Sequence, residues 1–153
     1  MMGYLFWGPV GTGKRYLAAC IANALLEQEV TVKMTNFNTI LNDLFAAEDK
    51  TEYIRVLNGY ELLIIDDLGV ERNSEYALEN IFSVIDWRYQ SGKPLIITTN
   101  IPLVQLKQET KIEKKRIYDR ILERCILVKI DGVSRREAMA NDNMQTMKNI
   151  LKI

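Results

Sequence analysis

A seven-residue segment near the start of the chain has the spacing of a phosphate-binding loop. The pattern G-x-x-x-x-G-K is formed by Gly8, Pro9, Val10, Gly11, Thr12, Gly13 and Lys14. Its glycines allow backbone N–H groups to turn inward around a polyphosphate, and a helix that follows offers its positive N-terminal end. Lys14 adds a point charge for the β and γ phosphates. The pattern predicts a site for a nucleoside triphosphate.

The residue after Lys14 departs from this pattern. Most such loops place Ser or Thr there, and the hydroxyl holds a magnesium ion. This chain has Arg15, whose guanidinium has five donors and no acceptor and therefore cannot ligate a metal. We expect Arg15 either to crowd the ion or to reach a phosphate itself, so nucleotide binding is predicted while efficient hydrolysis is left open.

Polar residues follow two later apolar runs. Residues 62–65 lead into Asp66 and Asp67, and residues 95–99 lead into Asn100. At the ends of parallel strands beside a phosphate loop, Asp66 is predicted to hold the magnesium ion and Asp67 to activate the attacking water. The amide of Asn100 can hydrogen-bond both the γ phosphate and that water.

Arginines recur on one face of a basic helical segment. Arg116, Arg120 and Arg124 stand at i, i+4 and i+8 within 111–124, and like charges at that spacing repel one another. We expect something anionic to face them: the nucleotide of an adjoining subunit, reached by Arg120 or Arg124 as an arginine finger, or a DNA backbone. The alternative is a solvated helix face. Further on, an arginine of the pair at 135–136 is a candidate to return to the nucleotide of its own subunit.

Composition excludes several classes of protein. The chain has 153 residues, 48% of them hydrophobic, which fits one globular domain, and it contains no histidine. Ser-His triads and the common zinc frameworks are therefore excluded. Its 20 basic and 20 acidic side chains balance, so a uniformly basic coat for nucleic acid is absent. Acidic residues exceed basic ones in 1–110, and the reverse holds in 111–153.

Cysteine usage and hydropathy indicate where the chain resides. Cys20 and Cys125 both lie in apolar surroundings in the sequence, and we expect two buried thiols in a reducing cytoplasm. No apolar run approaches the ~20 residues that a membrane span needs. The sequence therefore predicts a cytoplasmic protein without membrane contact.

Strand-like and helix-like segments alternate along the chain. Short apolar runs are expected to form strands at 4–7, 30–35, 62–65, 95–99 and 126–130. Strands this apolar need cover on both faces, which predicts an α/β fold with a parallel sheet between helices. Helical spacing predicts buried stripes at Leu17, Ile21, Ala24 and Leu25, and at Ala77, Leu78, Ile81, Val84 and Ile85.

Taken together, the motifs resemble the AAA+ ATPase domain of DnaC-like helicase loaders and of the related IstB-like transposition helper ATPases. The resemblance is carried by the loop at 8–14, by Ile64-Ile65-Asp66-Asp67-Leu68-Gly69, by Ile97-Thr98-Thr99-Asn100 and by 119–124. It implies that these segments are Walker A, Walker B, sensor 1 and the arginine-finger region, and that Arg136 is the sensor 2 arginine.

The resemblance also implies a fold and a domain organisation. The implied fold is a P-loop NTPase of three layers, with a five-stranded parallel sheet in the order 5-1-4-3-2 and a lid that is reduced or absent. Residues 1–153 are then a single AAA+ domain, excised from a longer protein whose N-terminal module binds a helicase or transposase.

The sequence is compatible with three functions. One is an ATP-dependent loader that uses ATP/ADP and Mg²⁺ to place a replicative helicase on single-stranded DNA. The others are an IstB-like transposition helper on duplex DNA and a nucleotide-binding scaffold without turnover. The resemblance places single-stranded DNA contacts in 36–58, where Lys50 and Arg55 are the only cations, and it implies a homo-oligomer when assembled. A small-molecule kinase is disfavoured because no arginine-rich lid lies near the loop.

Overall fold

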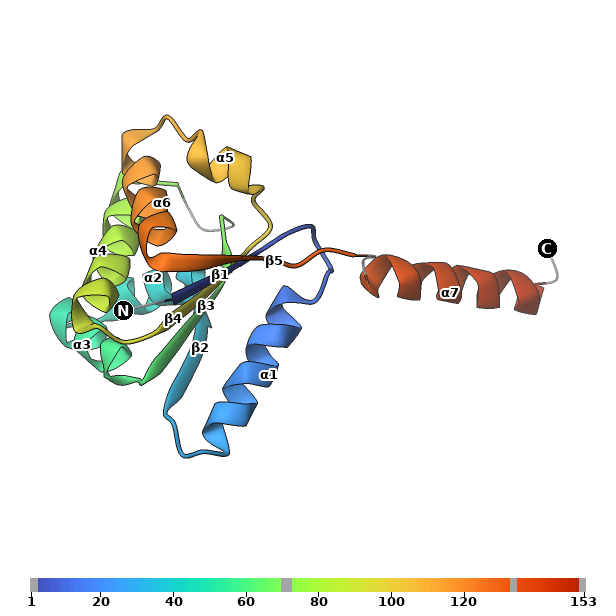
Figure 1. Ribbon diagram of the computed structural model, residues 1–153, viewed down its shortest axis with the longest axis horizontal. Helices are drawn as coiled ribbons and strands as arrows, with labels where there is room; N and C mark the ends of the chain where they lie inside the picture. The colour runs from blue at the N-terminus through green and yellow to red at the C-terminus, as the bar shows by residue number, and fades with distance from the viewer. Residues whose placement is uncertain (1–2, 70–72, 133–134, 152–153) are drawn as a thin grey trace.

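The computed structural model shows one parallel sheet with helices on both faces (Figure 1). It describes residues 3–69, 73–132 and 135–151, and their side chains except those of 135–140. The strands are β1 (Gly3–Trp7), β2 (Val32–Asn36), β3 (Leu62–Leu68), β4 (Leu95–Thr99) and β5 (Cys125–Lys129). The helices are α1 (Lys14–Leu26), α2 (Phe37–Ala46), α3 (Lys50–Gly59), α4 (Glu75–Ser91), α5 (Leu103–Lys107), α6 (Ile112–Arg124) and α7 (Arg135–Leu151).

The strand order places β1, which leads into the phosphate loop, between β4 and β5. The order is β2-β3-β4-β1-β5 and every pairing is parallel. Leu5 of β1 pairs with Ile97 of β4 on one side and with Leu127 of β5 on the other. Read from the opposite edge, this is the expected order 5-1-4-3-2, which confirms the predicted α/β fold.

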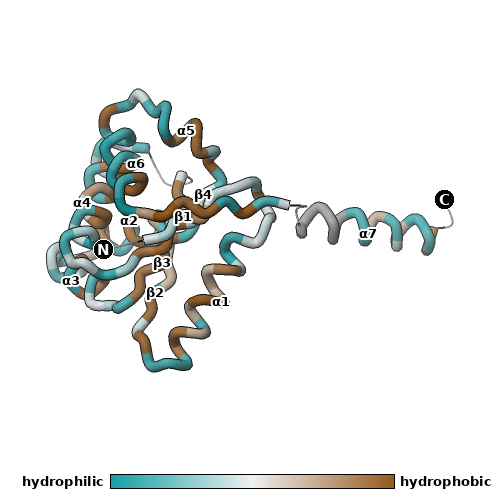
Figure 2. Tube along the Cα trace, in the orientation of Figure 1, coloured by the Kyte–Doolittle hydropathy of each residue, from teal (hydrophilic) through white to brown (hydrophobic). Residues whose placement is uncertain are grey.

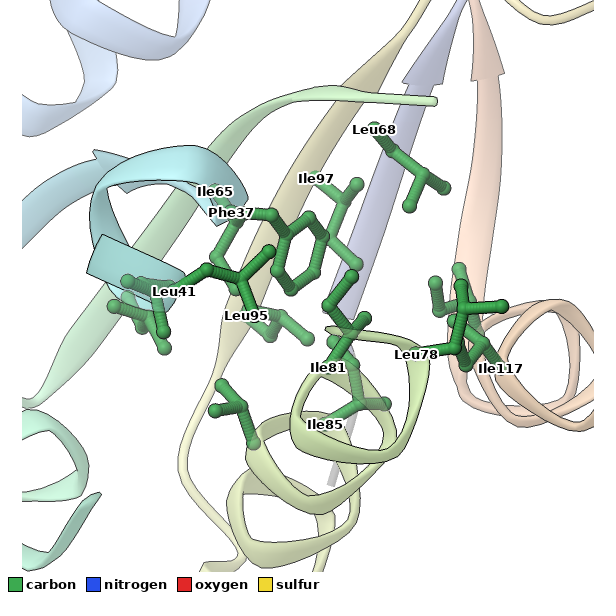
Figure 3. Packing of buried hydrophobic residues seen from close by; sticks show 14 of the residues in the cluster. Phe37, Leu41, Ile65, Leu68, Leu78, Ile81, Ile85, Leu95, Ile97 and Ile117 are labelled. Carbon is green, nitrogen blue, oxygen red and sulfur yellow. The ribbon is translucent and has the colours of Figure 1, made fainter. Parts of the chain in front are cut away.

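Alternation along the central strands divides the core in two. Leu63 and Ile65 point to one face of the sheet, while Leu62 and Ile64 point to the other. The first face is covered by α2, α3, α4 and α6 and carries the larger cluster (Figure 3). The second is covered by α1 over a smaller cluster that includes Phe6. Figure 2 shows the corresponding band of hydrophobic residues along the strands.

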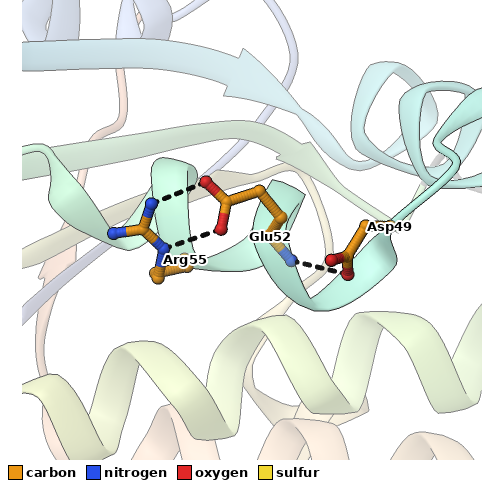
Figure 4. Close-up of polar contacts among 3 residues, drawn as sticks. All are labelled: Asp49, Glu52 and Arg55. Carbon is orange, nitrogen blue, oxygen red and sulfur yellow. Dashed lines mark hydrogen bonds and ion pairs between the residues drawn. The ribbon is translucent and has the colours of Figure 1, made fainter.

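Side-chain caps begin three of the helices that cover the larger cluster. Asn36 accepts a hydrogen bond from the backbone of Thr39 at the start of α2, and Ser74 does so from Ala77 at α4. Asp49 caps α3 through the N–H of Glu52 (Figure 4). These caps satisfy N–H groups that the helix leaves without internal partners. The helix and the buried stripe predicted at 77–85 are confirmed.

The predicted buried stripe of α1 is wrong. The buried residues are Lys14, Ala18 and Ala22, whereas Leu17 and Ala24 are exposed. Ile21 and Leu25 are partly buried against the smaller cluster. The helix is therefore rotated so that its small alanines face the strands. Where several faces of a helix carry apolar residues, periodicity alone does not determine which one faces the sheet.

The expectation of two buried cysteines holds for only one of them. Cys125, at the start of β5, is buried, whereas Cys20 is exposed on α1. The rotation of α1 that buries Ala18 and Ala22 turns Cys20 toward solvent. Burial raises the pKa of the Cys125 thiol to about 12, so this thiol stays protonated at neutral pH.

One charged side chain in the core ties several backbone segments together. Arg88 of α4 is fully buried and donates hydrogen bonds to the carbonyl oxygens of Asn58, Tyr60, Glu61 and Pro94. Burial lowers the pKa of Arg88 to about 10. The contacts join α4 to the end of α3 and to the segments that enter β3 and β4, so Arg88 has a structural role.

The chain continues beyond β5 into α7, which extends away from the sheet (Figure 1). In the described part of α7, the apolar side chains Met144, Met147, Ile150 and Leu151 are exposed. Within the described residues, no helix is both long enough and apolar enough to cross a membrane.

Candidate nucleotide-binding site

A cavity of about 450 Å³ lies at the ends of β1, β3 and β4, within the size range of ligand sites. It brings together residues that are far apart in the sequence. The lining residues are Val10, Gly11, Gly13, Lys14, Arg15, Tyr16, Ala19, Asp66, Asp67, Thr98 and Asn100. The predicted loop, carboxylates and amide therefore meet at one place, as the parallel strand order requires.

The loop is held by close contacts with the end of β5. A Cβ added at Gly8 would lie 1.9 Å from the carbonyl oxygen of Ile130, so only glycine fits there. The Thr12 hydroxyl lies 2.9 and 3.1 Å from the carbonyl oxygens of Pro9 and Ile130, and its one hydrogen can be donated to either. Gly13 precedes α1 with a φ of 97° and makes no side-chain cap. The first N–H groups of α1 are thus not satisfied by a capping side chain, which suits an anion.

Lys14 is buried at the base of the loop. Its Nζ donates to the carbonyl oxygens of Gly8 and Pro9 at 2.9 and 2.7 Å. Burial lowers the pKa of Lys14, and the charges of Asp67 and Asp66 oppose this shift. The side chain is therefore positioned within the loop, and a phosphate that binds there replaces neutral carbonyl partners with a charged one.

The two carboxylates occupy different environments. Asp66 is buried, and its Oδ1 accepts a hydrogen bond from the Thr98 hydroxyl. Asp67 is partly buried and has a φ of 58°, a left-handed conformation that is uncommon outside glycine and often marks a functional site. The N–H of Asp67 donates to the same Thr98 hydroxyl at 2.9 Å. Thr98 thus orients both residues from the neighbouring strand.

Sequence reasoning missed Thr98 as a site residue. The available signal was the pair Thr98-Thr99, two hydroxyl residues between an apolar run and Asn100. Asn100 itself is exposed and lines the cavity, in agreement with its predicted location. Arg136 lies in the first turn of α7, but its side chain is outside the described residues, and its role stays a prediction.

The residues at the expected magnesium site do not offer the ion its usual set of ligands. Nε of Arg15 lies 3.5 Å from Oδ2 of Asp66, so a cation from the chain is next to the carboxylate predicted to hold the metal. Arg15 offers no lone pair, and the Thr12 hydroxyl is bound within the loop. Among the described residues, no cluster of three or more Asp, Glu, Cys or His side chains could hold a metal.

The arginine stripe is outside this cavity and packs on α4 of the same chain. The Arg120 guanidinium is 3.1 Å from the Asp86 carboxylate. The Arg124 guanidinium is 3.7 Å from the centre of the Tyr89 ring, and Arg116 stacks on Phe82 at 4.2 Å. A carboxylate and two aromatic rings therefore face the stripe, where the sequence predicted an anionic partner or solvent. Cation–π contacts account for the close packing of these arginines.

The fold and the cavity define a P-loop NTPase of the AAA+ type. Residues 4–142 match the family described as IstB-like ATP binding protein. The chain belongs to this family, which confirms the resemblance drawn from its motifs.

Individual relatives include both helicase loaders and proteins of insertion sequences. The replicative helicase loader DnaC of Escherichia coli (strain K12) is 29% identical over 123 residues, covering 77% of this chain and 49% of DnaC. A putative ATP-binding protein of insertion sequence IS232 from Bacillus thuringiensis subsp. berliner is 31% identical over 138 residues, covering 86% of this chain and 54% of that protein. The chain spans about half the length of the curated relatives it matches.

A solved structure shows the same likeness. The crystal structure of DnaI superposes with a TM-score of 0.74 at 27% identity, covering 88% of this chain and 73% of that chain.

Proposed function

We propose that this chain is the ATP-binding domain of a helicase loader that acts on single-stranded DNA during replication in the cytoplasm. The proposed partner is a replicative helicase, and ATP or ADP binds at the cavity of the phosphate loop. The similarity to DnaC supports this proposal. The structural observation that supports single-strand binding is a second cavity, which is lined by groups suited to nucleic-acid bases.

This second cavity, of about 480 Å³, lies where α2, α3 and the start of α4 meet. It is lined by Leu41, Asn42, Phe45, Lys50, Ser74, Tyr76 and Ala77. Phe45 is 83% exposed, which is unusual for so large an apolar side chain. Tyr76 is 45% exposed, and the Lys50 ammonium lies 4.7 Å from its ring centre.

Exposed aromatic rings beside a cation suit a single strand better than a duplex. Unpaired bases stack on such rings, at ~1–3 kcal/mol per base, while a lysine attracts the phosphate backbone. In a duplex the base faces are already stacked on one another. The Lys50 ammonium donates a hydrogen bond to the Tyr76 hydroxyl and keeps its positive charge at the cavity, whereas Arg55 forms a double hydrogen bond with the carboxylate of Glu52 (Figure 4). The segment 36–58 therefore contributes Phe45 and Lys50, and α4 contributes Tyr76.

The experiment is binding of a fluorescent oligonucleotide, single-stranded or duplex, measured by anisotropy. Phe45→Ala and Tyr76→Ala are each expected to weaken single-strand binding about tenfold, the loss of one stacked base. Trp87→Ala is the control, since Trp87 is an exposed aromatic residue of α4 that does not line this cavity. A preference for duplex DNA that survives both substitutions would contradict the loader and favour the IstB-like transposition helper.

Hydrolysis is a separate part of the proposal. We propose Asp67 as the base that activates water and Asn100 as the amide that orients it, since both line the cavity. Arg15 stands where a hydroxyl ligand is usual, so we propose slow turnover in this chain. A nucleotide-binding scaffold without turnover remains the second candidate, and the Arg15–Asp66 contact is the observation that favours it.

A further inference from the structure

Arg15 brings a guanidinium to the buried carboxylate of the nucleotide site. The side chain of Arg15 is 76% exposed, that of Asp66 is 8% exposed, and they meet at 3.5 Å. The other oxygen of Asp66 accepts the Thr98 hydroxyl. Both oxygens of this carboxylate therefore have partners within the chain, and the partner of Oδ2 is positively charged.

The charges around the cavity are already balanced by side chains. Lys14 and Arg15 are positive, and Asp66 and Asp67 are negative; all four line the same cavity. A divalent cation at Asp66 would lie beside the guanidinium and be repelled by it, and this repulsion is stronger in a partly buried site than in water. Arg15 cannot reduce the repulsion by coordination, because it has no lone pair to offer.

The exposed side of Arg15 remains available to a ligand. A guanidinium presents its N–H groups in a planar fork that pairs with two phosphate oxygens at once. The contact with Asp66 is made through Nε at 3.5 Å, and 76% of the Arg15 side chain is exposed, so a phosphate can reach the guanidinium. The buried carboxylate thus orients the arginine, as it would orient a metal ion in a related site.

We infer that this chain binds a nucleoside triphosphate without a divalent cation, with the Arg15 guanidinium in the place of magnesium. The inference rests on the proposed function, which puts the triphosphate in the same cavity. It adds that the nucleotide is recognised as the free anion. Arg15 is then a residue that determines metal dependence and nucleotide affinity together.

The test is calorimetric titration with a non-hydrolysable ATP analogue, once with EDTA and once with magnesium chloride. For the wild-type chain we expect the two dissociation constants to agree within about twofold, because a charge fixed to the chain is present in both buffers. For Arg15→Thr we expect binding about tenfold or more tighter with magnesium than with EDTA, because the hydroxyl restores a metal ligand.

A matched control is Arg55→Thr, which removes an exposed arginine paired with the carboxylate of Glu52 and distant from the cavity. It is expected to behave as the wild-type chain in both buffers. Circular dichroism checks that Arg15→Thr is folded, which its exposed position favours.

A failure of this inference and a failure of the proposed function give different results. Wild-type binding that is about tenfold tighter with magnesium than with EDTA would overturn the role of Arg15 and leave the nucleotide site intact. A wild-type chain that binds the analogue in neither buffer would overturn both proposals.

Discussion

The hydroxyl of Thr98 on β4 donates a hydrogen bond to the carboxylate of Asp66 on β3. It also accepts the backbone N–H of Asp67. Both Thr98 and Asp66 are buried, so water does not readily replace either bond. A single hydroxyl therefore fixes the directions of two neighbouring acidic residues from the adjacent strand, and the geometry of the candidate site depends on β4 as well as on β3.

Replacement of Thr98 by valine should destabilise the protein. Thr98→Val keeps the shape but leaves Asp66 and the Asp67 N–H short of a partner, at a cost of about 1–3 kcal/mol in the free energy of unfolding. Urea denaturation measures this change. Thr98→Ser retains the hydroxyl and is expected to lose less. A valine variant as stable as the wild-type chain would show that the bond does not matter for stability.

Lys14→Ala should weaken nucleotide binding. The variant removes the buried ammonium at the base of the loop, and the affinity for ATP is expected to fall at least about tenfold. Isothermal titration calorimetry gives the dissociation constant. Lys33→Ala is the control, because Lys33 is an exposed lysine of β2 outside the cavity. Equal affinities for Lys14→Ala and the wild-type chain would contradict the prediction that nucleotide binds at this loop.

Arg15→Thr should raise magnesium-dependent ATP hydrolysis. The threonine supplies the hydroxyl that metal-assisted phosphoryl transfer uses, and it releases Asp66 from the arginine. Phosphate release is measured for both chains with and without single-stranded DNA. If the wild-type chain already turns over as fast as Arg15→Thr, the expected slow hydrolysis and its assignment to Arg15 are wrong.

Arg120 or Arg124 should complete the active site of a neighbouring subunit. Arginine fingers contribute ~10³-fold or more to the rate of phosphoryl transfer. In the more active Arg15→Thr background, Lys14→Ala chains are mixed with chains that carry Arg120→Ala and Arg124→Ala. Each chain supplies what the other lacks, so hydrolysis should partly recover on a single-stranded DNA scaffold.

Two controls accompany the mixing experiment. Arg116→Ala alters the same stripe at its stacking contact with Phe82 and should not reduce hydrolysis. Size measurements must show that the mixed chains assemble. If the chains assemble and hydrolysis does not recover, Arg120 and Arg124 do not act on a neighbouring subunit and have only their packing role on α4.

The two cysteines should differ in reactivity. Cys20 is exposed and Cys125 is buried, with the pKa of Cys125 raised to about 12 by burial. At pH ~8 a thiol reagent is expected to modify Cys20 quickly and Cys125 only after unfolding, because the thiolate is the reactive form. Cys20→Ser should eliminate the fast reaction, and mass spectrometry reads the result. Fast modification of that variant would contradict the buried position of Cys125.

Local patterns in the sequence were enough to predict the class of fold and the main parts of the site. The glycines at 8, 11 and 13 with Lys14 stand at fixed spacing, and that spacing reflects one continuous backbone turn. The apolar runs before Asp66 and Asn100 end at the same edge of a parallel sheet, so their meeting followed from strand direction alone.

Other features depended on contacts between segments far apart in the chain. The rotation of α1, which buries Ala18 and exposes Cys20, depends on how closely the helix packs on the sheet. The contact of Arg124 with Tyr89 depends on where α6 lies against α4.

The contact of Arg15 with Asp66 joins residues 51 positions apart. Residue type and spacing showed that Arg15 could not bind the metal, because that limit belongs to the guanidinium itself. Only the tertiary structure showed which carboxylate the guanidinium meets, because a contact between α1 and β3 is set by packing and not by any spacing along the chain.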